Sequence, residues 1–123
     1  MAEILVIDDE AQMRRLIARY LNGAGHTVHQ AGNGRDGLAL FHRVHPVLVI
    51  TDIVMPDMEG IEMIRELRKE APATPILAIS GGGPAVYLRA ATGMGATAAL
   101  AKPFSADALL SAVENLLTKS EAG

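Results

Sequence analysis

Cysteine is absent from this 123-residue chain, and aromatic side chains make up only 3% of it. Without cysteine there can be no disulfide, no thiolate metal site and no cysteine nucleophile. The core must therefore be aliphatic, and the half of the residues that are hydrophobic is enough to build one. The length suits a single domain over residues 1–123, with Ser120–Gly123 expected to form a frayed tail.

An excess of positive charge and a long apolar run are also missing. The 11 Lys and Arg residues against 14 Asp and Glu residues give a formal net charge of −3. Nonspecific nucleic-acid binding needs clustered cations, so we expect none by this chain. No apolar run approaches the roughly 20 residues that a membrane-spanning helix needs. We therefore expect a soluble, cytoplasmic protein without membrane contact.

Short apolar runs recur along the chain and are typical of strands buried on both faces of a parallel sheet. They are Ile4–Ile7, Val47–Ile50, Ile76–Ile79 and, more weakly, Ala98–Ala101. A further candidate strand, His26–Ala31, mixes polar with apolar residues, which favours a place at the edge of the sheet.

Helical patterns, with apolar residues three and four positions apart, separate these runs. The expected helices run from about Met13 to Gly23, from about Arg35 to before Pro46, from Ile61 to before Pro72, from about Pro84 to Met94, and onward from Ser105 as N-cap. The order is therefore βα repeated five times. It predicts an α/β fold, with an open, doubly wound parallel sheet of five strands covered by helices on both faces.

Chemically active side chains follow the ends of the predicted strands. Asp8 and Asp9 follow the first predicted strand, Asp52 the third, Ser80 the fourth and Lys102 the fifth. Because the carboxyl ends of parallel strands lie along one edge, where ligands bind, we expect these side chains to lie close together. Neighbouring carboxylates repel one another, and a hard divalent cation such as Mg²⁺ would keep them ionised.

Such a site suits phosphoryl transfer to an aspartate, because carboxylates form acyl phosphates and the loose transition state needs mainly positioning and charge neutralisation. Asp9 and Asp52 could bind Mg²⁺ directly and Asp8 through water. Lys102 and Ser80 would then face the outer phosphoryl oxygens. Taken alone, Asp8 and Asp9 could instead cap the helix that follows them.

Several segments in the same order resemble the receiver domains of bacterial two-component response regulators, the chemotaxis receiver among them. They are V-I-D-D-E at 6–10, D-I-V-M-P-D-M-E-G at 52–60, Ser80 and A-K-P-F at 101–104. The resemblance covers roughly Glu3 to Leu117. It implies a flavodoxin-like strand order 2-1-3-4-5, with the His26–Ala31 strand at an edge.

The resemblance also implies roles for the acidic residues. Asp52 is expected to be the phosphoacceptor. Asp8, Asp9 and Asp52, together with the backbone carbonyl of Val54, are expected to hold Mg²⁺. The phosphoryl donor would be a phosphohistidine on a sensor histidine kinase or a histidine phosphotransfer domain. On this interpretation the protein is not a conventional enzyme, although it catalyses its own phosphotransfer and dephosphorylation.

Lys102 is expected from the resemblance to contact the phosphoryl group, with a cis peptide bond before Pro103. Ser80 is expected to be the switch hydroxyl. Ala99 stands where the family usually has a Tyr or Phe, so the aromatic half of the switch is missing. The Gly81–Gly83 loop is expected to order on phosphorylation, because glycine has a large ordering cost.

The altered surface is expected around the Pro84–Met94 helix, the last strand and the last helix, with Tyr87 as a partner contact or, equally, packed on the sheet. Three outputs fit the sequence: a single-domain regulator that binds a target protein, a phosphorelay intermediate, or a receiver excised from a longer regulator. The sequence specifies no oligomeric state. Gly60 is expected to permit a special backbone angle and to have no chemical role.

A second motif suggests a different function. Gly32, Gly34 and Gly37 form G-x-G-x-x-G between a strand and a helix, with Asp52 at the spacing of a dinucleotide fingerprint. A small nucleotide-binding, Rossmann-like module is therefore an alternative, although the motif would follow an edge strand and leaves Lys102 unexplained. The other alternative for these glycines is a turn and an N-cap.

Overall fold

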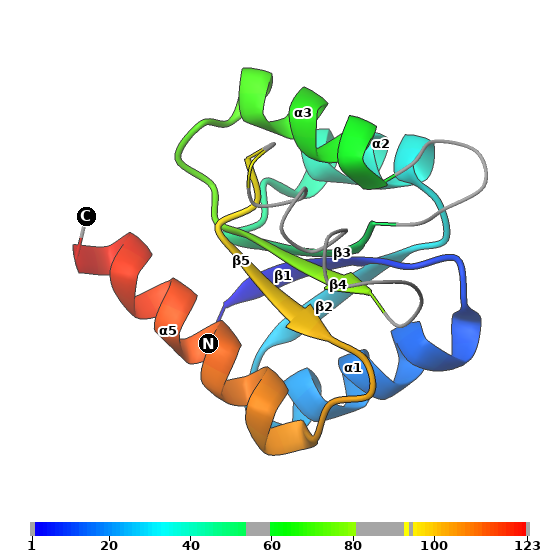
Figure 1. The fold of residues 1–123 in the computed structure, drawn as a ribbon, viewed down its shortest axis with the longest axis vertical. Helices are drawn as coiled ribbons and strands as arrows, with labels where there is room; N and C mark the ends of the chain where they lie inside the picture. Colours follow the sequence, from blue (N-terminus) through cyan, green and yellow to red (C-terminus); the bar gives the residue numbers. More distant parts are fainter. Residues whose placement is uncertain (1, 54–59, 81–92, 94, 123) are drawn as a thin grey trace.

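The structure is a computed structural model that describes residues 2–53, 60–80, 93 and 95–122. Strands and helices alternate from residue 3 to residue 80, as expected (Figure 1). The elements are β1 (Glu3–Ile7), α1 (Ala11–Gly23), β2 (Thr27–Ala31), α2 (Gly34–Val44), β3 (Leu48–Asp52), α3 (Gly60–Glu70), β4 (Ile76–Ser80), β5 (Ala98–Ala101) and α5 (Ala106–Ala122). The expected helix from Pro84 to Met94 lies almost entirely outside the described residues.

The five strands form one parallel sheet in the order β2-β1-β3-β4-β5. The predicted strand order is confirmed, and so is the edge position of the polar strand, which begins at Thr27. β1, β3 and β4 occupy the centre, and every residue of β3 and β4 is buried. Buried apolar runs thus mark central strands, as parallel sheets require.

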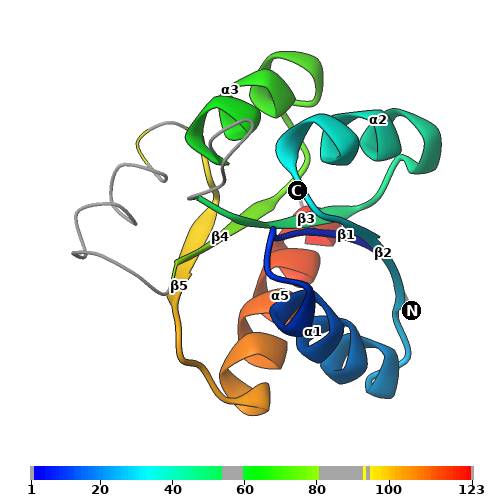
Figure 2. The same ribbon diagram turned by 90° about the vertical axis from the view of Figure 1, so that its right-hand side faces the viewer.

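Helices cover both faces of the sheet: α2 and α3 lie on one side, and α1 and α5 on the other (Figure 2). Side chains of β1 alternate between two apolar clusters. Leu5 and Ile7 join the cluster that includes Phe41 of α2, whereas Ile4 and Val6 join the cluster that includes Ile17 of α1. The core is therefore double, with the sheet as its middle layer.

Local signals set several helix ends. The Asn33 side chain accepts a hydrogen bond from the Asp36 backbone N–H at 2.8 Å and caps α2. The Ser105 hydroxyl accepts one from the Ala108 N–H at 3.0 Å, which confirms its predicted place at the start of α5. The backbone of α5 is helical as far as Ala122, further than the expected start of a frayed tail at Ser120.

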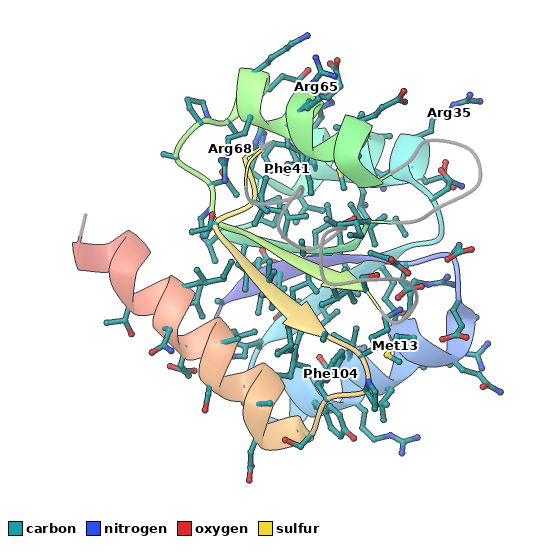
Figure 3. The ribbon with its side chains drawn as sticks, in the orientation of Figure 1. Met13, Arg35, Phe41, Arg65, Arg68 and Phe104 are labelled. Carbon is teal, nitrogen blue, oxygen red and sulfur yellow. The ribbon has the colours of Figure 1, made fainter. Side chains whose placement is uncertain are left out.

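At the amino-terminal edge of the sheet, Arg68 of α3 connects three parts of the chain (Figure 3). Its Nε donates to the Gly95 carbonyl at 2.7 Å and its Nη1 to the carbonyls of Ala71 at 3.0 Å and Thr74 at 2.7 Å. Its Nη2 donates to the Thr97 hydroxyl at 3.2 Å. Burial lowers the pKa of Arg68, but an arginine stays charged. The side chain thus fixes the start of β5 against the end of α3.

None of the helices in the described part of the chain has both the length and the apolar character needed to span a bilayer.

Candidate functional site

The parallel register brings the ends of four strands to one edge. Ile7 pairs with Thr51, Asp52 with Ile79, and Ser80 with Ala101. The backbone ladder continues one residue further, because the Asp8 N–H donates to the Ala31 carbonyl at 3.1 Å and the Lys102 N–H to the Ser80 carbonyl at 2.8 Å. The residues that follow the strands therefore lie next to one another along the carboxyl edge of the sheet. The backbone hydrogen bonds of the sheet fix the positions from which their side chains extend.

Three carboxylates gather there, and an oxygen from each of Asp8, Asp9 and Asp52 lies within 4.8 Å of the other two. Asp8 is fully buried and Asp52 is 8% exposed, whereas Asp9 is exposed. Buried carboxylates at this separation repel one another and need positive charge. Their hard oxygen donors fit Mg²⁺ and do not suit a soft metal ion.

Lys102 supplies a cation from the protein itself. Its Nζ donates to Oδ2 of Asp8 at 2.9 Å and to Oδ2 of Asp52 at 3.2 Å. Burial by itself would lower the pKa of Lys102, but the hydrogen bond to Asp8 and the charges of Asp52 and Asp8 outweigh it, and the pKa is raised. The peptide bond before Pro103 is cis, as expected. A protonated amine thus lies between two carboxylates.

Asp8 also belongs to the turn between β1 and α1. Its Oδ1 accepts a hydrogen bond from the Glu10 backbone N–H at 2.9 Å, and Glu10 is the N-cap residue of α1, without a capping bond from its own side chain. Asp8 is therefore not the N-cap residue itself, but one of its carboxylate oxygens binds the turn before α1 while the other accepts from Lys102.

Arg14 also contributes to this turn, although no sequence pattern singles it out. Its Nη1 donates to the backbone carbonyl of Asp8 at 2.6 Å. In the sequence, Arg14 is a basic residue near the start of a helix, and such residues are common on solvated helix faces. Its bond to Asp8 could therefore not be predicted.

Two hydroxyls lie at the same edge. Ser80 ends β4 and is 7% exposed, so it stands at the edge as predicted. Thr51 is fully buried, and its Oγ1 donates to the Asp52 carbonyl at 2.9 Å, a contact that the sequence did not suggest. Both groups flank the end of β3, where Asp52 leaves the sheet.

The other expected site residues lie outside the carboxylate cluster or outside the described residues. Ala99 is exposed on β5, on the face opposite Ala98 and Leu100, which pack against the cluster of α1 and α5. Gly60 is the first residue of α3. Val54, Gly81 and Tyr87 lie outside the described residues, so the expectations for them remain predictions.

The G-x-G-x-x-G segment follows the edge strand β2 and packs against the chain. A Cβ on Gly37 would lie 2.5 Å from Cδ1 of Ile7, and one on Gly32 would lie 3.3 Å from Nη1 of Arg14. Together with the capping of α2 by Asn33, these contacts support the alternative of a turn and an N-cap. The glycines provide room for neighbouring side chains.

A family model described as response regulator receiver domain matches residues 4–114. "Probable transcriptional regulator ycf27" of Cyanophora paradoxa is 34% identical over 119 residues, which are 97% of this chain and 49% of that protein. This chain thus spans about half the length of that relative.

Solved structures agree. A crystal structure of NtrX from Brucella abortus superposes with a TM-score of 0.95 at 34% identity, over 98% of this chain and 28% of that one. A response regulator receiver domain protein from Clostridium thermocellum superposes with a TM-score of 0.94 at 31% identity, over 99% of this chain and 98% of that one. By fold and by sequence, this chain belongs to the response regulator receiver domains of two-component systems.

Proposed function

We propose that this chain is a phosphorylation switch in which Asp52 accepts a phosphoryl group. The observation that carries the proposal is the position of Lys102, whose ammonium bridges Asp8 and Asp52 within a cluster of three carboxylates. A structural ion pair needs one carboxylate for each cation. Among the described residues, Lys102 is the cation that pairs with these carboxylates, and three carboxylates around it favour a site that works with a further cation.

In the proposed reaction, a carboxylate oxygen of Asp52 forms a bond to phosphorus, while the bond between phosphorus and the donor nitrogen of a phosphohistidine breaks. Asp52 needs no general base, because it attacks as a carboxylate. Lys102 turns from the carboxylate of Asp52 to the new phosphoryl oxygens, where it offsets their charge. Ser80, at the end of the adjacent strand β4, donates a hydrogen bond from its hydroxyl to the same phosphoryl group.

Asp8, Asp9 and Asp52 would hold the metal ion, with the Val54 carbonyl as a further oxygen donor. When bound, Mg²⁺ neutralises the negative charge of the phosphoryl oxygens. The fit rests on the all-oxygen donor set and on the short distances between the carboxylates. The burial of Asp8 and Asp52 strengthens their attraction for a cation, because the local dielectric constant is low.

The proposed donor is a sensor histidine kinase or a histidine phosphotransfer domain in the cytoplasm. The proposed output is an altered surface on β5, on α5 and on the Pro84–Met94 segment, most of which lies outside the described residues. Relatives such as the ycf27 protein are transcriptional regulators about twice as long as this chain. An output through an attached domain is therefore one form of the proposal, beside a target protein or a phosphorelay. Return of the phosphoryl group to a histidine phosphotransfer domain would single out the relay.

The decisive experiment is incubation with acetyl phosphate, with Mg²⁺ or with EDTA, followed by intact-mass spectrometry. Wild type should gain one phosphoryl group only with Mg²⁺, and Asp52→Asn should gain none. Asp107→Asn is the matched control, because Asp107 is an exposed aspartate in the first turn of α5. Equal labelling of Asp52→Asn and wild type, or labelling that is unchanged by EDTA, would refute the proposal.

A further inference from the structure

We infer that Arg14 is a positioning residue for the acidic cluster, which it serves by holding the backbone of Asp8 in place. The inference rests on the proposed function, because it concerns how strongly the same carboxylates bind Mg²⁺. Arg14 lies in α1, and its backbone N–H donates to the Glu10 carbonyl at 3.1 Å. Its guanidinium reaches back past the start of the helix to the carbonyl of Asp8, at 2.6 Å from Nη1.

Asp8 has a partner at each of its polar groups. Its N–H donates to the Ala31 carbonyl at 3.1 Å, its Oδ1 accepts from Glu10 at 2.9 Å, and its Oδ2 accepts from Lys102 at 2.9 Å. The bond from Arg14 completes this set at the carbonyl. That carbonyl is the first beyond the end of β1, where the sheet no longer fixes the chain.

The surroundings of the Arg14 guanidinium leave room for its bond to the Asp8 carbonyl. A Cβ on Gly32 would lie 3.3 Å from Nη1 of Arg14, so a glycine at this position leaves the room that the guanidinium needs. Nε of Arg14 is buried without a hydrogen-bond partner among the described residues, and such burial lowers stability. This cost favours a placement that serves the contact between Nη1 and the Asp8 carbonyl over one that serves stability alone.

The charge and the hydrogen bond of Arg14 act on a metal ion in opposite directions. A positive charge beside the acidic cluster repels an incoming cation. A bond that holds a ligand residue in place strengthens metal binding, and loss of such a partner typically weakens it about 10–100-fold. The sign of the change in Mg²⁺ affinity therefore separates positioning from simple electrostatics.

The test is a titration of metal-free protein with MgCl₂, followed by amide chemical shifts in NMR spectra of wild type, Arg14→Gln, Arg14→Lys and Arg15→Gln. Arg15 is the matched control, since it is the exposed neighbour in the same helix turn and Arg15→Gln removes the same charge. We expect Arg14→Gln to raise the Kd for Mg²⁺ about tenfold. Arg15→Gln should leave the Kd unchanged or lower it slightly, and Arg14→Lys should recover part of the loss.

Gly32→Ala provides a second route that keeps Arg14, because the added methyl group would crowd its guanidinium. We expect a smaller rise of the Kd for Mg²⁺ in this variant, which also decides the question if Arg14→Gln fails to fold. A Kd in Arg14→Gln no higher than in Arg15→Gln, or a lower melting temperature with an unchanged Kd, would overturn the inference. Failure of the proposed function looks different, because wild type itself would then bind no Mg²⁺ and accept no phosphoryl group.

Discussion

The ammonium of Lys102 lies 2.9 Å from Oδ2 of Asp8, although 94 residues separate the two in the sequence. The contact joins the end of β5 to the end of β1, which are not neighbours in the sheet. It passes the end of β3, where Asp52 accepts the second bond of the same ammonium at 3.2 Å. Loss of this one cation therefore affects two carboxylates at once.

Lys102→Met should destabilise the metal-free protein by on the order of 2 kcal/mol, because two charged acceptors lose their donor. The pKa of Lys102 is raised: burial alone would lower it, but the bond to Asp8 and the charge of Asp52 outweigh burial. A cation whose pKa is raised by folding stabilises the fold fully at pH values below its pKa in the unfolded chain, about 10.4 for lysine. This contribution disappears as the pH rises through the pKa of the folded state.

The free energy of unfolding, measured with urea in EDTA, should therefore differ between wild type and Lys102→Met by a constant amount up to about pH 10 and converge above it. Lys69→Met serves as control, because the side chain of Lys69 is 72% exposed and pairs, among the described residues, with Glu66 across one turn of α3. If the difference in the free energy of unfolding persists at strongly alkaline pH, the charge of Lys102 does not cause it.

Asp9→Asn should stabilise the metal-free protein and weaken its response to Mg²⁺. Asp9 belongs to the cluster, but Lys102 bonds only to Asp8 and Asp52 among the described carboxylates. Removal of this charge relieves repulsion, which we expect to raise the free energy of unfolding by up to about 1 kcal/mol. Thermal unfolding in EDTA and in MgCl₂ measures both effects. The prediction fails if Asp9→Asn melts below wild type in EDTA.

Gly37→Ala should destabilise the fold by about 1–3 kcal/mol through overpacking. Its methyl group would lie 2.5 Å from Cδ1 and 2.9 Å from Cγ1 of Ile7, which is fully buried and stiff because it is β-branched. Gly23→Ala, at the end of α1, meets nothing within 4 Å and should be neutral or stabilising by up to about 1 kcal/mol. Urea unfolding of the two variants makes the comparison, and equal losses of stability would show that packing on Ile7 is not the reason for the glycine.

Ala99→Tyr should fold with a stability within about 0.5 kcal/mol of wild type, because Ala99 is exposed and surface substitutions change stability little. The variant introduces the aromatic side chain that the resemblance to receiver domains leads us to expect at this position. Chemical denaturation measures the stability, and phosphorylation by acetyl phosphate is expected to continue at the wild-type level. A loss of more than about 2 kcal/mol would show that the position is packed in solution.

The arrangement of the sheet and the cluster of charged side chains at its edge could be predicted because both follow from local patterns. Buried runs such as Ile76–Ile79 indicate central strands, and the mixed run before Ala31 indicates an edge strand. Once the strands are parallel, their carboxyl ends must share one edge. The convergence of Asp8, Asp52 and Lys102 then follows from topology alone.

Contacts that cross between elements through long side chains could not be predicted in this way. Arg14 and Arg68 look like ordinary solvated helix residues in the sequence, yet each donates to backbone carbonyls of other segments. Which carbonyl a guanidinium reaches depends on the packing of the helix and on the room left by glycines such as Gly32. Periodicity predicts which side of a helix is buried, but it carries no information about these distances.

If the acidic cluster binds Mg²⁺ as proposed, the arriving ion meets carboxylates that already have a cation beside them. Asp8 and Asp52 are partly neutralised by the Lys102 ammonium, so the net gain of the ion would be smaller than at unpaired carboxylates. Such binding would follow the concentration of free ion in the surroundings and would reverse readily. Between binding events, the same ammonium would hold the two carboxylates together.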